Sequence, residues 1–113
     1  MKTAAKLVAL IALASSAAGA VAQSPQHGSE STKEFKAVAM SMMKNMDAAS
    51  YTGNPDVDFR THMIPHHRGA IAMAKVALKY AYAAETKRMA QKIIDDQEKE
   101  VADMQAWLKK NGH

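Results

Sequence analysis

Two adjacent histidines near the middle of the chain, His66 and His67, follow Met63 by three and four residues. Side chains at these spacings lie over one turn of an α-helix, so their three heads can converge. Imidazole nitrogen binds copper, zinc, nickel and iron, whereas thioether sulfur selects soft ions, above all Cu(I). The pattern therefore predicts a soft-metal site, with copper as the best candidate and Cu(I) favoured over Cu(II).

Other methionines can extend this donor set. Met73 lies at the rim of the same helix face, and Met42 and Met46 stand one turn apart on the preceding segment. Because methionine also fills irregular cores, Met40, Met42, Met43 and Met46 are open to either role, packing or binding. The predicted metal ligands are Met63, His66, His67, Met73, Met42 and Met46.

The absence of cysteine narrows the chemistry. The chain has nine methionines, five histidines and no cysteine. It therefore cannot form a disulfide, a thiolate metal site, an iron–sulfur cluster or a covalently attached c-type haem. No serine follows Ser50, so no serine or cysteine nucleophile beside the histidine pair can be argued. We expect a metal-binding protein that is not an enzyme.

Three segments carry apolar residues at the three- and four-residue spacing of amphipathic helices. Ser31 and Glu34 match the S-x-x-E capping box, so the first helix is expected over residues 31–49. A loop that contains Gly53, Asn54 and Pro55 precedes a second helix over 56–82, and a third is expected over 85–110. The three stripes are Phe35, Val38, Ala39, Met42, Met46 and Ala49; Phe59, Met63, Ala70, Met73, Ala74 and Ala77; and Ala90, Ile93, Gln97, Val101, Met104 and Leu108.

The second helix must position the histidine pair. At ~100° per residue, His66 and His67 border the apolar stripe on either side of Met63, so both imidazoles are expected to face inward. Pro65 falls on the outer face and should kink or loosen this turn. Gln97, the one polar residue in the third stripe, is a candidate to orient an imidazole. The solvent side carries the basic residues Arg68, Lys75 and Lys79.

The N-terminal residues predict export. Lys2 and Lys6 precede a short apolar run, and the segment ends in small residues at Ala20 and Ala22, which is typical of a cleaved signal peptide. We expect a periplasmic or secreted protein with no stable membrane insertion after cleavage. Cleavage leaves thirteen basic and eleven acidic residues, interspersed and without an arginine-rich run, so a nucleic-acid partner is not expected.

These observations predict an all-α protein, an antiparallel bundle of three main helices. Such a bundle can be completed by a second copy of the chain. The expected division is a signal peptide over 1–22, a flexible leader over 23–30, the helical domain over 31–110 and a short tail over 111–113.

The chain also resembles a known family. The run that contains Met63-Ile64-Pro65-His66-His67 and the downstream Ala70-Ile71 and Met73-Ala74 is similar to the signature of the CopM-like family. This is a group of small exported proteins with a ferritin-like helical fold, long catalogued as a domain of unknown function. The resemblance covers roughly residues 32–110. It implies a ferritin-like bundle, periplasmic copper binding and copper tolerance, with Met63, His66, His67 and Met73 as the positions carried over. Copper-trafficking proteins are candidate partners of such a protein.

Two alternatives stay open. One is a structural or interaction bundle with a methionine-rich core and no metal. The other is a di-iron enzyme, which needs inward glutamates and Glu-x-x-His pairs from several helices. The chain has no Glu-x-x-His and the second helix has no glutamate before Glu85, so the sequence disfavours this second alternative.

Overall fold

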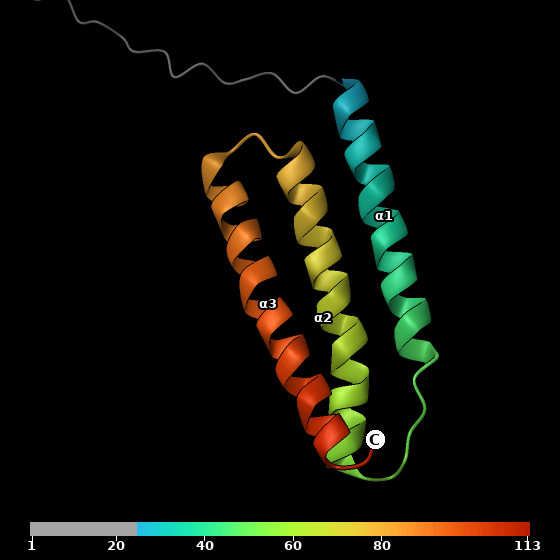
Figure 1. Cartoon of the computed structure of the whole chain (residues 1–113). Helices are drawn as coiled ribbons and strands as arrows, with labels where there is room; N and C mark the ends of the chain where they lie inside the picture. Colours follow the sequence, from blue (N-terminus) through green and yellow to red (C-terminus); the bar gives the residue numbers. More distant parts are fainter. Residues whose placement is uncertain (1–24) are drawn as a thin grey trace, which may run out of the picture.

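The computed structural model describes residues 25–113, which form three α-helices and no strand. Helix α1 spans Pro25–Asp47, α2 spans Pro55–Tyr80 and α3 spans Ala84–Lys110. Neighbouring helices run antiparallel, and α2 lies between the other two (Figure 1). The prediction of an all-helical protein with three helices is therefore confirmed. The predicted signal peptide over 1–22 lies outside the described residues.

Helix α1 begins earlier than the sequence predicted. It starts at Pro25, so residues 25–30, which we assigned to the leader, are helical. The expected capping box at Ser31 does not form, because the hydroxyls of Ser31 and Thr32 both donate to the carbonyl of Gly28, at 3.0 and 2.8 Å. A serine or threonine inside a helix satisfies its hydroxyl by bonding back to the preceding turn in this way.

The ends of α2 and α3 follow local sequence signals more closely. The side chain of Asn54 accepts a hydrogen bond from the backbone N–H of Asp56, which caps α2, and Pro55 occupies the first turn. Residues 81–83 form the turn to α3. At the other end, Asn111 is the C-cap of α3 and Gly112 has φ +80°, a left-handed conformation that suits glycine.

The α2–α3 contact is a heptad seam. Val57, Ile64 and Ile71 recur every seven residues on α2 and are buried. Ile94, Val101 and Leu108 do the same on α3. A seven-residue apolar repeat keeps one side of a helix against its partner along its whole length, as in coiled coils. These six residues, with Ala74 and Ala90, form the hydrophobic core.

Helix α1 packs on a different side of α2. The thioether of Met42 lies over Gly69, where a Cβ would come within 2.4 Å of the Met42 Cγ and Sδ atoms. Near the opposite end, the Glu34 carboxylate accepts hydrogen bonds from Lys79 Nζ at 2.5 Å and Tyr80 Oη at 2.6 Å. The six residues of the predicted first stripe, of which Ala49 lies just beyond the end of α1, are all half-buried, whereas Met40 and Met43 beside them are exposed.

The three helices form a single layer and not a closed bundle. Helices α1 and α3 each pack along α2, and their backbones do not come close to one another. The apolar stripe predicted for α2 is consequently only partly covered: Phe59 is 59% exposed and Met73 39%. The expectation that this stripe would face the core is therefore wrong for these two residues. The buried side of α2 is the neighbouring one, where Val57, Ile64 and Ile71 meet α3. Within residues 25–113 no helix combines the length and apolar character needed to cross a membrane.

Candidate functional site

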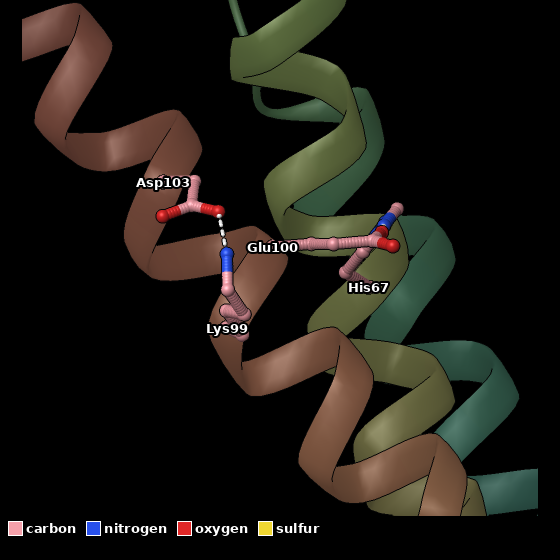
Figure 2. A network of polar contacts seen from close by, with 4 residues as sticks. All are labelled: His67, Lys99, Glu100 and Asp103. Carbon is pink, nitrogen blue, oxygen red and sulfur yellow. Dashed lines mark hydrogen bonds and ion pairs between the residues drawn. The ribbon is translucent and has the colours of Figure 1, made fainter.

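His67 is the one buried polar side chain of the described residues, with 9% of its surface exposed. It lies seven residues before Ala74, on the side of α2 that packs against α3. Its Nε2 atom is 2.5 Å from Oε2 of Glu100, which reaches across from α3 (Figure 2). Lys99 and Asp103 pair along the side of α3, at 2.6 Å, and take no part in this contact. Burial and the carboxylate together fix the orientation of the His67 ring.

The hydrogen bond to Glu100 also determines which ring nitrogen of His67 is available. A carboxylate oxygen accepts, so Nε2 carries the proton and Nδ1 of the neutral ring holds the lone pair. The Nδ1 atom is buried and has no hydrogen-bond partner. A carboxylate that holds one imidazole N–H and so directs the other nitrogen toward an ion is the usual arrangement around metal-ligating histidines. His67 therefore has the geometry of an oriented ligand.

His66 is placed differently from its neighbour. It is exposed, so the expectation that both imidazoles face inward holds for His67 and is wrong for His66. The two ring centroids are 6.1 Å apart and the ring planes are tilted by 58°. An imidazole that binds an ion through a bond of about 2 Å has its centroid about 3 Å from that ion, so two rings sharing an ion lie within roughly 6 Å. The observed separation is at that limit, and the exposed ring of His66 has room to turn.

The methionines predicted as ligands divide between different sides of α2. Met63 is half-buried between the two histidines, one turn before them. Met42 lies over Gly69, on the side that faces α1 and away from His67. Met46 follows Met42 by one turn, so the antiparallel register of α1 and α2 places it level with Pro65 and His66. Two turns beyond His66, Met73 lines an apolar groove with Met89 and Ile93.

Glu100 was not among the predicted site residues, and Gln97 was expected to orient the imidazole. The structure gives the orienting role to Glu100, while the Oε1 atom of Gln97 is buried without a hydrogen-bond partner. Residues equidistant from the turn at 81–83 meet across an antiparallel helix pair, and this relation places Gln97, not Glu100, level with His67. Glu100 lies three residues further along α3 and reaches the His67 ring with its long side chain, so a count along the sequence alone would not have found it.

His62 is held one turn before His66. Its Nδ1 atom is 2.8 Å from the carbonyl oxygen of Asp58, and its ring stacks on Tyr51 with centroids 4.1 Å apart. The Nε2 atom is buried and has no partner. A proton on Nδ1 satisfies the carbonyl, so the lone pair of His62 lies on Nε2. His62 thus resembles His67 in having one ring nitrogen engaged and the other unengaged.

Carboxylates and imidazoles alone do not make a metal site in the described part of the chain. Within residues 25–113 no three histidine, aspartate or glutamate side chains converge in a way that could hold an ion. A site at the histidine pair therefore depends on the Met63 thioether as well as on imidazole nitrogen. That mixture of donors suits a soft ion, because thioether sulfur is a poor ligand for hard cations.

The sequence of almost the whole chain matches one family model, that of DUF305, a domain of unknown function, over residues 4–108. This chain belongs to the DUF305 family. No curated protein matches it. Membership in DUF305 carries no assigned activity, so a function must be argued from the site itself.

Proposed function

We propose that this DUF305 protein binds a copper ion, with Cu(I) favoured over Cu(II), through Met63, His66 and His67. The observation that carries the proposal is the His67 ring, which is buried, held at Nε2 by Glu100 and left without a partner at Nδ1. Removing a polar atom from water without a hydrogen bond costs stability, so an orphaned nitrogen one helical turn from a methionine is a feature that ligand binding explains.

Each of the three donors has a distinct part. His67 Nδ1 is the oriented nitrogen, Met63 supplies a soft sulfur within the same turn, and His66 adds a nitrogen from the exposed side. Among the methionines of α1, Met46 is the one closest to His66 along the axis of the helix pair, so it is the candidate for a fourth donor. Met42, which lies over Gly69, and Met73, in the apolar groove, have packing surroundings and are secondary candidates.

The proposal includes the biological setting that the sequence indicates. We infer that the ion is cargo, buffered or delivered in the periplasm in support of copper tolerance, and that the protein is not an enzyme. Support for export comes from the signal-peptide pattern of residues 1–22, and support for the copper role and for a ferritin-like relation comes from the CopM-like motif at Met63–His67. In the single chain, His66 is exposed beside the buried His67, which leaves a route by which a trafficking protein can reach the ion.

Competition titration tests the copper proposal. Cu(I) is titrated anaerobically into the protein against a coloured Cu(I) chelator, and the affinity is compared among variants. His67→Gln should lose more affinity than any other single substitution, and Glu100→Gln should weaken binding by about 10- to 100-fold, as second-layer carboxylates do. His113→Gln and Met40→Leu are the matched controls, because His113 is in the C-terminal tail and Met40 is 72% exposed on α1. If the combined His66→Gln and His67→Gln variant kept the affinity of the original protein, the copper proposal would be wrong.

The alternative is a structural or interaction bundle that binds no metal, and the exposed methionines of α1 and α3 favour it. Met40, Met43 and Met89 are 62–72% exposed and have no ligand-like surroundings in the described structure. A ligand that binds only the folded state must raise the melting temperature. Added Cu(I) that leaves the melting temperature of the protein unchanged would favour this alternative over copper binding.

A further inference from the structure

One side of α2 carries a heptad seam that α1 and α3 cover only in part. Phe59, Met63, His66, Ala70 and Met73 follow one another at alternating spacings of four and three residues, and Ala77 continues the series. Such alternation is the a/d pattern by which one helix packs along another. Phe59 is 59% exposed, Met73 is 39% exposed and His66 is exposed. Met63, Ala70 and Ala77 are half-buried, so the helices of residues 25–113 cover this seam only in part, and we call it the open seam.

A groove lies beside the open seam. It has a volume of about 220 Å³ and lies where Met73 of α2, Met89 of α3 and Phe35 of α1 come together. Met89 is 65% exposed, and Ala70, Ala77 and Ile93 also line the groove. Phe59 protrudes from the same side of α2 as the groove, about 21 Å before Met73 at ~1.5 Å per residue. An apolar groove and a separate protruding aromatic side chain on one face make a self-complementary surface of the kind that a two-fold dimer uses.

We infer that a second copy of this chain docks on the open seam, with the two α2 helices antiparallel about a two-fold axis. Phe59 of each copy then fills the groove beside Met73 of the other. Because Phe59 and Met73 are equidistant from His66 in sequence, the axis passes at the level of His66. The small side chains of Ala70 and Ala77 allow the helices to approach closely. In the dimer, the layer of three helices in one copy packs face to face against the layer of the other copy.

The size of the face agrees with a dimer. The helices have 23, 26 and 27 residues, so the layer is about 39 Å long at ~1.5 Å per residue. Three helices whose axes are 8–10 Å apart make it about 25 Å wide. The face therefore offers on the order of 1,000 Å², and a stable interface needs about 800 Å² from each partner.

Charge selects this face of the layer over the opposite one. The opposite side of α2 presents the exposed Arg68 and Lys75, so two copies that met there would bring like charges together. The open seam contains no lysine, arginine, aspartate or glutamate between Phe59 and Ala77. Two identical copies can therefore meet at the open seam without repulsion, and each gains by removing Phe59 and Met73 from water.

The dimer does not require copper, but it would change the donors available to a copper ion. At the axis the two His66 rings face one another, beside the Met63 side chains of both copies. A second copy would thus add donors to the proposed copper site, whose two rings in one chain are at the limit of sharing an ion. The experiments below use protein stripped of metal, so failure of the copper proposal does not decide them.

Sedimentation velocity on the metal-free protein measures the association directly. The protein should be a dimer at tens of micromolar, and Phe59→Asp should raise the dimer dissociation constant about a hundredfold or more, because the charge is buried twice in a two-fold interface. Lys75→Asp is the matched control: it places the same carboxylate on the opposite face and should leave the dimer intact. Because Phe59 is 59% exposed in one chain, Phe59→Asp should keep the helical circular dichroism of the original protein.

A cysteine cross-link tests the register, since the chain contains no cysteine of its own. His66→Cys places two thiols at the axis and should give a disulfide-linked dimer on mild oxidation, whereas Lys75→Cys should stay monomeric under reducing-agent-free denaturing electrophoresis. Three results would overturn the inference: a monomer at 100 micromolar, a dimer that Phe59→Asp leaves intact, or a dimer in which His66→Cys does not cross-link. A monomer would leave the open seam to a different partner.

Discussion

Gly69 sets how closely α1 approaches α2, and its replacement by alanine is the sharpest test of the packing. A Cβ at this position would lie 2.4 Å from Met42 Cγ and Sδ and 2.8 Å from Met42 Cβ. The thioether can swing away, but Cβ moves only with the α1 backbone. Gly69→Ala therefore forces α1 outward, while alanine is intrinsically better than glycine in a helix by about 1 kcal/mol.

Two opposing effects determine the size of the change. Overpacking of a fitted contact costs about 1–3 kcal/mol. Set against the helix-propensity gain of about 1 kcal/mol, the expected result is a free energy of unfolding lower by roughly 1 kcal/mol. For a domain of this size, that corresponds to a melting temperature lower by about 4–8 °C. Urea denaturation followed by circular dichroism at 222 nm measures the change.

Gly28→Ala is the matched control. Gly28 also lies in a helix, α1, but a Cβ there would meet nothing within 4 Å. Only the propensity gain remains, so Gly28→Ala should raise stability by up to about 1 kcal/mol. The Met42→Ala background removes the Cγ and Sδ contacts, and Gly69→Ala should cost less there, which a double-mutant cycle measures. If Gly69→Ala stabilised the protein as much as Gly28→Ala does, the close approach of α1 and α2 would be refuted.

Three further predictions concern polar contacts. The Asp58 carboxylate accepts hydrogen bonds from the Thr52 backbone N–H at 2.7 Å, the Thr52 hydroxyl at 2.8 Å and the Gly53 N–H, which hold its pKa below the ordinary 3.8. A carboxylate whose pKa is lower in the folded state stabilises the fold at pH values above its unfolded-state pKa. This stabilisation is lost as the pH falls through the folded-state pKa. Asp58→Asn should therefore lower the melting temperature at pH 7 but not at the most acid pH tested. Glu34 raises the pKa of Lys79 to about 12, chiefly through their side-chain hydrogen bond, and its own pKa is lowered. Glu34→Gln should therefore lower the melting temperature modestly at pH 7, and less in 1 M salt. Asn54→Ala removes the α2 cap and should cost about 1 kcal/mol in urea denaturation.

Each of these three has an outcome that contradicts it. A difference between Asp58→Asn and the original protein that persisted at the lowest pH would mean that the carboxylate charge is not responsible. For Glu34→Gln, an effect independent of salt would assign the loss to Tyr80, whose hydroxyl donates to the same carboxylate. Asn54→Asp should retain the cap, so equal losses in Asn54→Ala and Asn54→Asp would exclude capping as the cause.

Much of the fold could be predicted from the sequence because helices are specified by local patterns. The three-residue and four-residue spacings of the first and third segments predicted two stripes of six residues each, and the structure buries or half-buries every member. Ala49 of the first stripe lies just beyond the end of α1. The helix ends marked by Asn54, Pro55 and Gly112 were predicted to within two residues, because capping and turn signals depend only on residues close by in the sequence. The start of α1 was missed because the helix continues through Gly28 without a terminating residue, and the Ser31 pattern imitates a cap.

The histidine pair shows where local patterns stop being sufficient. His66 and His67 differ by ~100° around α2, and each borders an apolar stretch, so the sequence treats them alike. Burial of His67 and exposure of His66 follow from where α3 docks, and that docking is chosen by Val57, Ile64 and Ile71 and by the matching heptad of α3. The same choice brings Glu100 from a helix 33 residues away to the His67 ring.

By itself, then, the sequence determined that this protein is helical, where most helix ends fall, and that imidazole and thioether donors share one turn of α2. Tertiary structure alone decided which imidazole is buried and oriented, which carboxylate holds it, and that an apolar seam of α2 stays open. The physical reason is that α2 has apolar residues on more than one side. A single helix pattern specifies which sides can be covered, but the neighbours that cover them are encoded in other segments of the chain.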